Sequence, residues 1–76
     1  MNNERRKKLR AIASELDMLR EQASELMDEE QEAFDNLPES LQGGKRGAAM
    51  EAAIESLDEA VDDLETVVSA IESACA

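Results

Sequence analysis

The sequence predicts an all-α protein: an antiparallel two-helix hairpin, coiled-coil-like, that dimerises into a four-helix bundle. Two long segments carry apolar residues spaced alternately three and four apart, as in coiled-coil helices. Between them, residues 36–47 hold the single proline and all three glycines, the residue types that interrupt helices. With 76 residues and one aromatic side chain, the chain is too short for a large core. We expect one domain, residues 1–76, with helices over about 4–36 and 45–74 and a turn over 37–44.

The first predicted helix follows an N-cap at Asn2 or Asn3 and carries an unbroken heptad seam, the row of a and d residues that faces a neighbouring helix. These positions are Leu9, Ile12, Leu16, Leu19, Ala23, Leu26, Glu30, Ala33 and Leu37. Glu30 is charged, so we expect it near a solvated end of the bundle or paired with Lys45 or Arg46. A third apolar row at e positions supplies the width that a four-helix bundle needs. It consists of Ala13, Met27 and Phe34.

Pro38 is expected to end this helix, because it lacks an N–H and disfavours helical geometry in the preceding residue. A short helical turn over 38–42 is expected next, followed by a reversal at Gly43 and Gly44 that uses positive φ. The second helix has a seam without a polar break, formed by Met50, Ile54, Leu57, Val61, Leu64, Val68, Ile71 and Cys75. Its g positions are small residues that let another helix approach: Ala53, Ala60, Val67 and Ala74.

Reversing the chain at the turn matches the two arms in length and pairs their seams. The expected neighbours are Leu26 with Leu57, Ala23 with Val61, Leu19 with Leu64, Leu16 with Val68, and Ile12 with Ile71. The e row of the first helix and the g row of the second would then face water in a monomer, so we expect a homodimer about 50 Å long. The predicted dimer contact consists of Met27, Phe34, Ala53, Ala60 and Val67.

The net charge of −11 is unevenly distributed along the chain. Residues 1–10 carry five basic and one acidic side chain, whereas residues 11–76 carry three basic and eighteen acidic ones. The basic cluster is expected beside the carboxyl end of the second helix, where it meets the negative end of the helix dipole and Glu72. It consists of Arg5, Arg6, Lys7, Lys8 and Arg10. Since the acidic body repels nucleic acid and anionic lipid, direct nucleic-acid binding by this cluster is the weaker hypothesis, and a basic protein partner is favoured.

The residue types that are missing argue against catalysis. The chain has no histidine, tryptophan or tyrosine, which removes the commonest general base and metal ligand, so we expect no enzymatic activity, no metal and no cofactor. Cys75 is the single cysteine and is expected to be an inert apolar side chain. A lone cysteine, together with no signal peptide and no membrane-spanning apolar run, favours a cytoplasmic location.

The acid of the second helix is the strongest functional signal. This helix carries eight carboxylates and no basic residue after Arg46, so it lacks the Glu-to-Lys pairs that stabilise ordinary exposed helices. Two interpretations stay open: the acid imitates a nucleic-acid backbone and binds a basic groove, or it keeps a small oligomer soluble. The candidate partner-binding residues are Glu55, Asp58, Glu59, Asp62, Asp63 and Glu65.

Residues 35–42, Asp-Asn-Leu-Pro-Glu-Ser-Leu-Gln, together with the acidic alanine-rich helix behind them, resemble a hairpin segment of small proteins encoded by phages and prophages. The resemblance covers the second half of the chain and carries over no functional residue. It implies a helical hairpin from a mobile element. By analogy with small acidic phage proteins, it further implies an inhibitor of a host defence complex, a DNA mimic of anti-CRISPR or anti-restriction type. The alternative is a structural or regulatory coiled-coil module for oligomerisation or as an adaptor.

Overall fold

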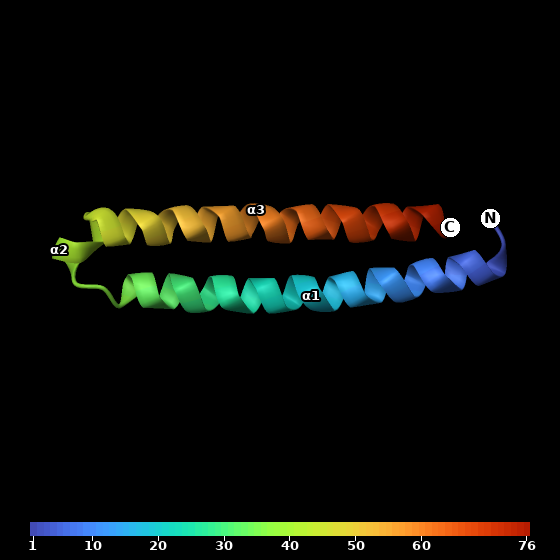
Figure 1. Cartoon of the computed structure of the whole chain (residues 1–76), viewed down its shortest axis with the longest axis horizontal. Helices are drawn as coiled ribbons and strands as arrows, with labels where there is room; N and C mark the ends of the chain where they lie inside the picture. Colours follow the sequence, from blue (N-terminus) through green and yellow to red (C-terminus); the bar gives the residue numbers. More distant parts are fainter.

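The computed structural model describes residues 1–76 and contains only helices. Two long helices, α1 (Asn3–Asp35) and α3 (Lys45–Ala74), lie antiparallel and side by side, joined by the short helix α2 (Glu39–Gln42) (Figure 1). Both termini lie at the end opposite α2. The Cα radius of gyration is 17.2 Å, against about 11 Å for a compact domain of this length. The predicted all-helical hairpin is confirmed.

Helix α1 begins at the N-cap Asn2, whose side-chain oxygen accepts a hydrogen bond from the Arg5 N–H at 2.8 Å. This bond satisfies one of the N–H groups that a helix start leaves unpaired. The predicted N-cap is thereby confirmed at the first of the two asparagines. At the other end, the backbone N–H of Asn36 donates to the Glu32 carbonyl at 3.0 Å, and Pro38 follows two residues later.

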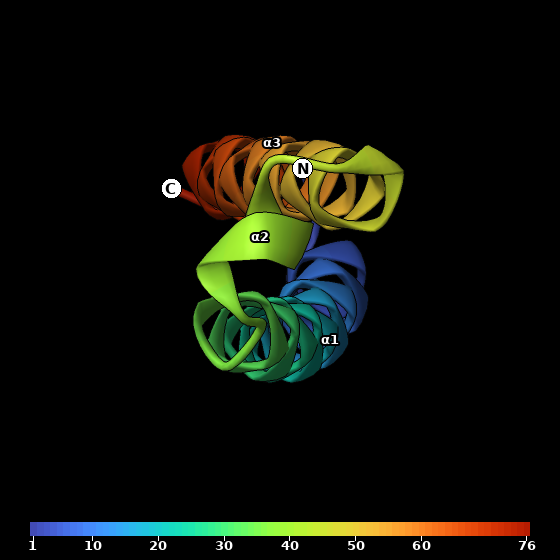
Figure 2. The same cartoon turned by 90° about the vertical axis from the view of Figure 1, so that its left-hand side faces the viewer.

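The chain reverses between α1 and α3 through α2 (Figure 2). The last residue of α2, Gln42, connects it to the end of α1. The N–H groups of Leu41 and Gln42 donate to the Pro38 carbonyl at 2.8 and 3.2 Å. The Gln42 side-chain amide donates to the carbonyls of Phe34 and Leu37 at 3.3 and 3.0 Å. These two bonds tie α2 to the end of α1, where the Phe34 carbonyl also accepts from the Leu37 N–H at 3.0 Å.

The glycines of this turn do not act as predicted. Gly43 and Gly44 have φ values of −84° and −91°, so the expectation of positive φ is wrong. A short helix with its own hydrogen bonds reverses the chain and makes a left-handed residue unnecessary. Gly47 has the special position instead, because it is buried and a Cβ atom there would overlap the backbone of Gln42.

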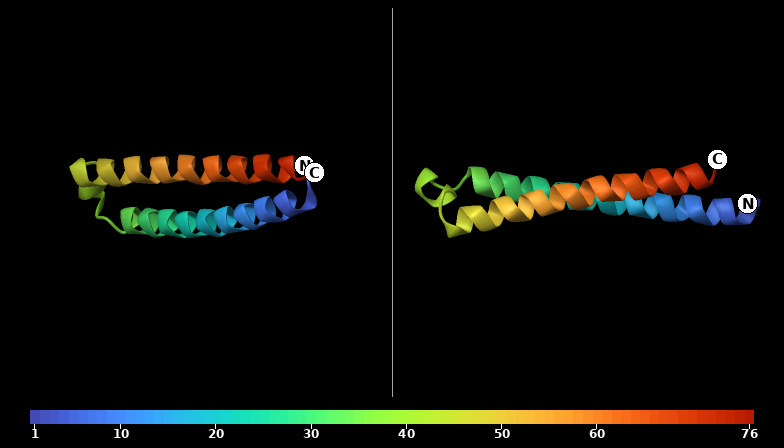
Figure 3. Two further views of the ribbon diagram at one scale, coloured as in Figure 1. Left: turned by 45° about the vertical axis from the view of Figure 1, so that its right-hand side comes forward. Right: turned by 90° about the horizontal axis from the view of Figure 1, so that it is seen from above.

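The seam of α3 is the one that its heptads predict. Val61, Val68 and Cys75 are buried at 7%, 8% and 5% exposure, and the remaining five a and d residues are half-buried. Buried residues number five in the whole chain. The hairpin thus has a single narrow core between two helices that cross at a shallow angle in the view from above (Figure 3).

The seam of α1 differs from the prediction by one row. Ile12, Leu19 and Leu26, predicted at d, are 46%, 53% and 60% exposed, so the expected pairing of these three residues with α3 is wrong. The a row faces α3 together with the e row, which is formed by Ala13, Arg20, Met27 and Phe34. Three rows of α1 are largely apolar, but a two-helix contact accommodates only two. The a and e rows bring in Phe34, the largest apolar side chain, and Arg20, which reaches the acid of α3.

Glu30 lies in this seam and is half-buried. The ion pairs of the chain involve Lys8 and Arg20 as the cations, so the expected pairing of Glu30 with Lys45 or Arg46 is absent. Glu30 keeps partial access to water, so it needs no buried counter-charge, and its place near a solvated end of a bundle stays a prediction.

Candidate functional site

The six predicted partner-binding carboxylates lie on α3 outside its seam, and we refer to them as the acidic face. All six are exposed: Glu55, Asp58, Glu59, Asp62, Asp63 and Glu65. A single continuous helix positions them, and one local hydrogen bond, from the Thr66 hydroxyl to the Asp62 carbonyl at 3.1 Å, accompanies them. They form no cluster of three or more that could hold a metal ion. The arrangement offers hydrogen-bond acceptors and negative charge to a macromolecular partner.

Five of these six carboxylates have no basic partner in the hairpin. The exception is Glu65, whose carboxylate lies 3.6 Å from the Arg20 guanidinium across the seam. The other cations close to α3 are Lys45 and Arg46 at its first turn and Arg10 near its last. From Glu51 to Asp63, the carboxylates of α3 therefore have no cation paired with them.

Arg20 is a residue that the sequence reasoning missed. Its side chain is 21% exposed and pairs with Asp17 at 2.9 Å, Glu65 at 3.6 Å and Glu21 at 3.8 Å. The hydrogen bond to Asp17, with the negative charges around it, raises the pKa of Arg20 above its ordinary value. The guanidinium therefore stays positively charged beside these carboxylates. Its position in the e row could have identified Arg20 from the sequence, since it is the single basic residue between Arg10 and Lys45.

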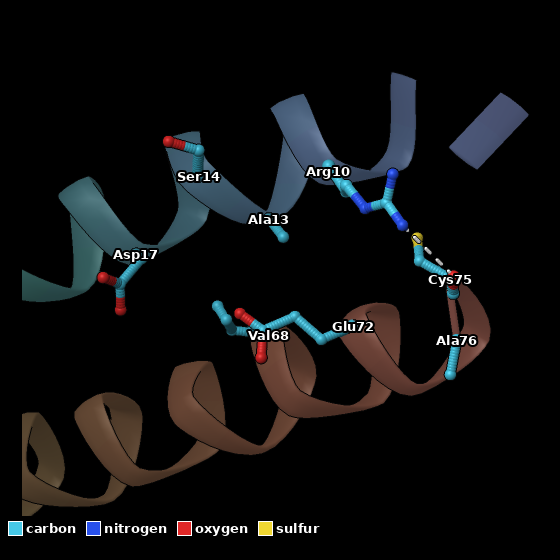
Figure 4. Close-up of a pocket in the computed structure, with 8 residues that line it drawn as sticks. All are labelled: Arg10, Ala13, Ser14, Asp17, Val68, Glu72, Cys75 and Ala76. Carbon is cyan, nitrogen blue, oxygen red and sulfur yellow. Dashed lines mark hydrogen bonds between the residues drawn. The ribbon is translucent and has the colours of Figure 1, made fainter. Parts of the chain in front are cut away.

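Of the basic amino-terminal cluster, Arg10 alone donates a side-chain hydrogen bond to the carboxyl end of α3, and the expected ion pair with Glu72 does not form. The Arg10 guanidinium donates to the Cys75 carbonyl at 3.4 Å, and the Cys75 thiol lies 3.7 Å from the Arg6 carbonyl. Figure 4 shows Arg10 reaching from α1 to this last turn, with Ala13 and Val68 facing each other beside it. A cation at the carboxyl end of a helix is favourable because it meets the negative end of the dipole. Cys75 is buried and forms no disulfide.

Two open hollows lie along the same flank of the hairpin, and both are mixed in character. The first is lined by Arg10, Ala13, Ser14, Asp17, Val68, Glu72, Cys75 and Ala76 (Figure 4). The second is lined by Met27, Asp28, Gln31, Phe34, Glu51, Ile54, Glu55 and Asp58. Because carboxylates surround the apolar floor of each hollow, neither resembles the apolar, enclosed pockets that bind small molecules.

The predicted dimer-contact residues separate into two groups. Ala53, Ala60 and Val67 are exposed on α3, as expected for a free surface. Met27 and Phe34 are half-buried and lie with Ile54 around the second hollow, so they belong to the contact between α1 and α3. The large apolar residues left exposed on α1 are Ile12, Met18, Leu19 and Leu26.

Comparison of the chain with protein-family models, curated proteins and solved structures finds no match. The resemblance to phage hairpin proteins therefore rests on the turn residues and the acidic helix alone. None of the helices is both long and apolar enough to cross a membrane.

Proposed function

We propose that this chain is a non-catalytic, phage-type protein-binding module that inhibits a nucleic-acid-binding defence complex in the host cytoplasm. The target class is a CRISPR effector or a restriction enzyme, and the acidic face would occupy its basic nucleic-acid groove. The observation that carries the proposal is the exposure of all six carboxylates of the acidic face along one helix. Such a surface attracts basic partners and repels nucleic acid.

The spacing of the charge supports imitation of a nucleic-acid strand. Residues 51–65 contain seven carboxylates and extend over about 22 Å of helix, or roughly one charge per 3 Å. A single strand of duplex DNA carries one phosphate per about 3.4 Å of helix axis. The two densities are close, so a groove that accommodates a phosphate backbone finds a similar row of charge on α3.

The proposal includes self-association into a four-helix bundle. Only five of the 76 residues are buried, and several large aliphatic side chains of α1 remain exposed. Pairing of two hairpins would cover such residues at roughly 25 cal/mol per Å² of apolar surface. A homodimer would also present two acidic faces to a partner.

A pair of charge-matched variants tests the acidic face. In the first variant Asp58, Glu59, Asp62 and Asp63 are replaced by their amides, and Glu65 is kept because it pairs with Arg20. The control replaces four exposed carboxylates that lie outside both the acidic face and residues 28–35 by glutamine: Glu15, Glu25, Glu39 and Glu72. Both variants change the net charge equally, and circular dichroism verifies that both stay helical.

The readout is phage plating on bacterial strains that each carry one CRISPR or restriction system and express one form of the hairpin. We expect the wild type and the control to restore plaques on at least one strain and the variant of the acidic face to fail there. Equal rescue by the variant of the acidic face would exclude that face as the contact. No rescue by the wild type on any strain would contradict a defence target.

A second candidate function is a structural or regulatory coiled-coil module, favoured by the exposed aliphatic row of Ile12, Leu19 and Leu26. In this case apolar contacts hold the partner and the acid only solvates the assembly. Salt separates the two functions, because the Debye length is about 10 Å at 0.1 M and shorter at higher salt. A pull-down whose partner is retained at high salt favours the coiled-coil module, whereas loss of the partner favours the acidic face.

A further inference from the structure

The exposed aliphatic row of α1 and the small-residue row of α3 form one continuous surface, which we name the apolar flank. It consists of Ile12, Leu19, Leu26 and Ala33 from α1 and Ala53, Ala60, Val67 and Ala74 from α3. All eight residues are exposed. Each directly precedes a residue of the seam, for example Leu19 before Arg20 and Val67 before Val68.

The two rows share a side of the hairpin because both lie opposite the hollows. The hollows are lined by residues that directly follow a seam residue in the sequence. Examples are Asp17 and Gln31 on α1 and Asp58 and Glu72 on α3. Residues that precede a seam residue lie on the other side of that seam, since successive positions on a helix are about 100° apart. The flank with the hollows is thus mostly polar. The eight apolar residues occupy the other flank, where Glu15, Gln22 and Glu29 of α1 and Asp63 of α3 border them.

Two contacts between α1 and α3 show which residues of the two rows lie beside each other. Arg10 meets Cys75 and Arg20 meets Glu65, so residue numbers run in opposite directions at equal steps. This register places Leu19 beside Val67, Leu26 beside Ala60 and Ile12 beside Ala74. The apolar flank therefore consists of two adjacent rows, with large side chains on α1 and small ones on α3.

The area that the hairpin exposes fits a partner along its length. The accessible surface is 5606 Å², whereas a compact monomer of 8.3 kDa exposes about 4,600 Å². The excess of about 1,000 Å² is close to the roughly 800 Å² that each partner contributes to a standard protein interface. Exposure of this additional area to water is least favourable on the apolar flank, because its side chains are aliphatic.

The charge on α1 decides how a second copy would lie. Residues 4–10 carry a net charge of +4, and residues 28–35 carry −5 with no basic residue. If a two-fold axis passes at Leu19, perpendicular to the helices, Ile12 lies opposite Leu26 of the second copy. The same operation brings residues 4–10 alongside residues 28–34 of the second copy, so opposite charges meet at both ends.

We propose that a second copy of this chain covers the apolar flank with its turn at the opposite end, so that α1 packs antiparallel on α1 across a two-fold axis at Leu19. This inference rests on the homodimer of the proposed function and adds its face and its orientation. The small row of α3 lets the two α3 helices approach, with Val67 opposite Val67. Of the acidic face, Asp63 alone borders the contact, and the other five carboxylates stay accessible.

The reverse orientation, with both turns at one end, is disfavoured by charge. It packs α1 on α3 of the second copy and sets residues 28–35 against residues 51–58, a segment with three carboxylates and no basic residue. It also gathers both basic clusters at one end. Like charges at these separations oppose association.

Disulfide mapping tests the proposal in a Cys75→Ala background, which removes the native thiol. Leu19→Cys is expected to form a covalent dimer on mild oxidation, because the two residues meet on the axis within disulfide range. Ile12→Cys alone is expected to form none, whereas Ile12→Cys mixed with Leu26→Cys is expected to form a mixed dimer. Met18→Cys, which is exposed at 59% and points away from the flank, is the control for collisional cross-linking.

Sedimentation equilibrium of the unoxidised variants separates this inference from the homodimer itself. A dimer in which Leu19→Cys cross-links no faster than Met18→Cys overturns the proposed face and leaves the homodimer standing. A dimer whose cross-links join position 12 to position 74 overturns the orientation. A monomer at tens of micromolar overturns the homodimer and this inference together, and none of these results bears on the acidic face.

Discussion

Gly47→Ala is expected to destabilise the hairpin at the junction of α2 and α3. Gly47 is buried in the first turn of α3, and a Cβ there would overlap the carbonyl group and Cα of Gln42. Backbone atoms cannot rotate away as the end of a side chain can, so α2 must move. That movement disturbs Gln42, whose side chain holds the carbonyls of Phe34 and Leu37.

The size of the effect follows from two opposing contributions. Overpacking of a tight site costs about 1–3 kcal/mol, and loss of the Gln42 hydrogen bonds adds about 1 kcal/mol. Alanine regains about 1 kcal/mol because glycine is a poor helix former. We therefore expect a net loss of roughly 1–3 kcal/mol, which lowers the melting temperature by about 5–20 °C in a domain of this size.

Gly43→Ala is the matched control for this prediction. A Cβ at Gly43 would meet nothing within 4 Å, and its φ of −84° suits any residue. The same chemical change should therefore be neutral or stabilise by about 0.4–1 kcal/mol through the unfolded chain. Thermal unfolding followed by circular dichroism at equal protein concentrations compares the two variants. Equal melting temperatures would refute the steric account of the turn.

Three further predictions concern α1. Phe34→Ala should lower the free energy of unfolding by about 2 kcal/mol, less than the loss of a fully buried phenylalanine. Replacing the exposed Met18 by alanine should change it by less than about 0.5 kcal/mol. Equal effects of the two substitutions in urea unfolding would contradict the packing of the a and e rows against α3. Arg20→Gln should lower the melting temperature by more at low salt than at 1 M NaCl. The partners Asp17 and Glu65 are partly exposed, and salt screens such ion pairs. A loss of melting temperature that is independent of salt would contradict an electrostatic role of Arg20. Asn2→Ala should cost about 0.5–1 kcal/mol of helix stability, and hydrogen exchange at the first turn of α1 should report it, while an unchanged exchange rate would contradict the cap.

The fold was largely predictable because local signals agree with one another. The a and d rows of α3 carry the large apolar side chains, whereas its third apolar row, at g, is mostly alanine. The heptads therefore identify the residues of α3 that face α1. Helix α1 has three largely apolar rows, and periodicity alone cannot decide which two face α3. The decision depends on Phe34 at the turn and on Arg20 reaching Glu65, both of which are contacts between segments distant in sequence.

The surface was predictable in composition and less so in geometry. Exposure of the six carboxylates follows from their positions outside the seam of α3. The membership of the apolar flank does not, because it depends on the rotation of α1, and this rotation exchanges Met27 and Phe34 for Leu19 and Leu26. The turn shows the same limit: glycine indicates where the chain reverses, but the role of Gly47 depends on how closely α2 approaches α3.

If a second copy covers the apolar flank, most of the acidic face stays free for a partner. Sedimentation equilibrium of the wild-type chain and of Leu19→Glu, at tens of micromolar protein, tests this contact directly. We expect the wild type to have twice the chain mass of 8.3 kDa and Leu19→Glu to have the mass of one chain, with unchanged helicity because Leu19 is 53% exposed in the hairpin. A wild type with the mass of one chain, or a dimer that Leu19→Glu leaves intact, would contradict this contact.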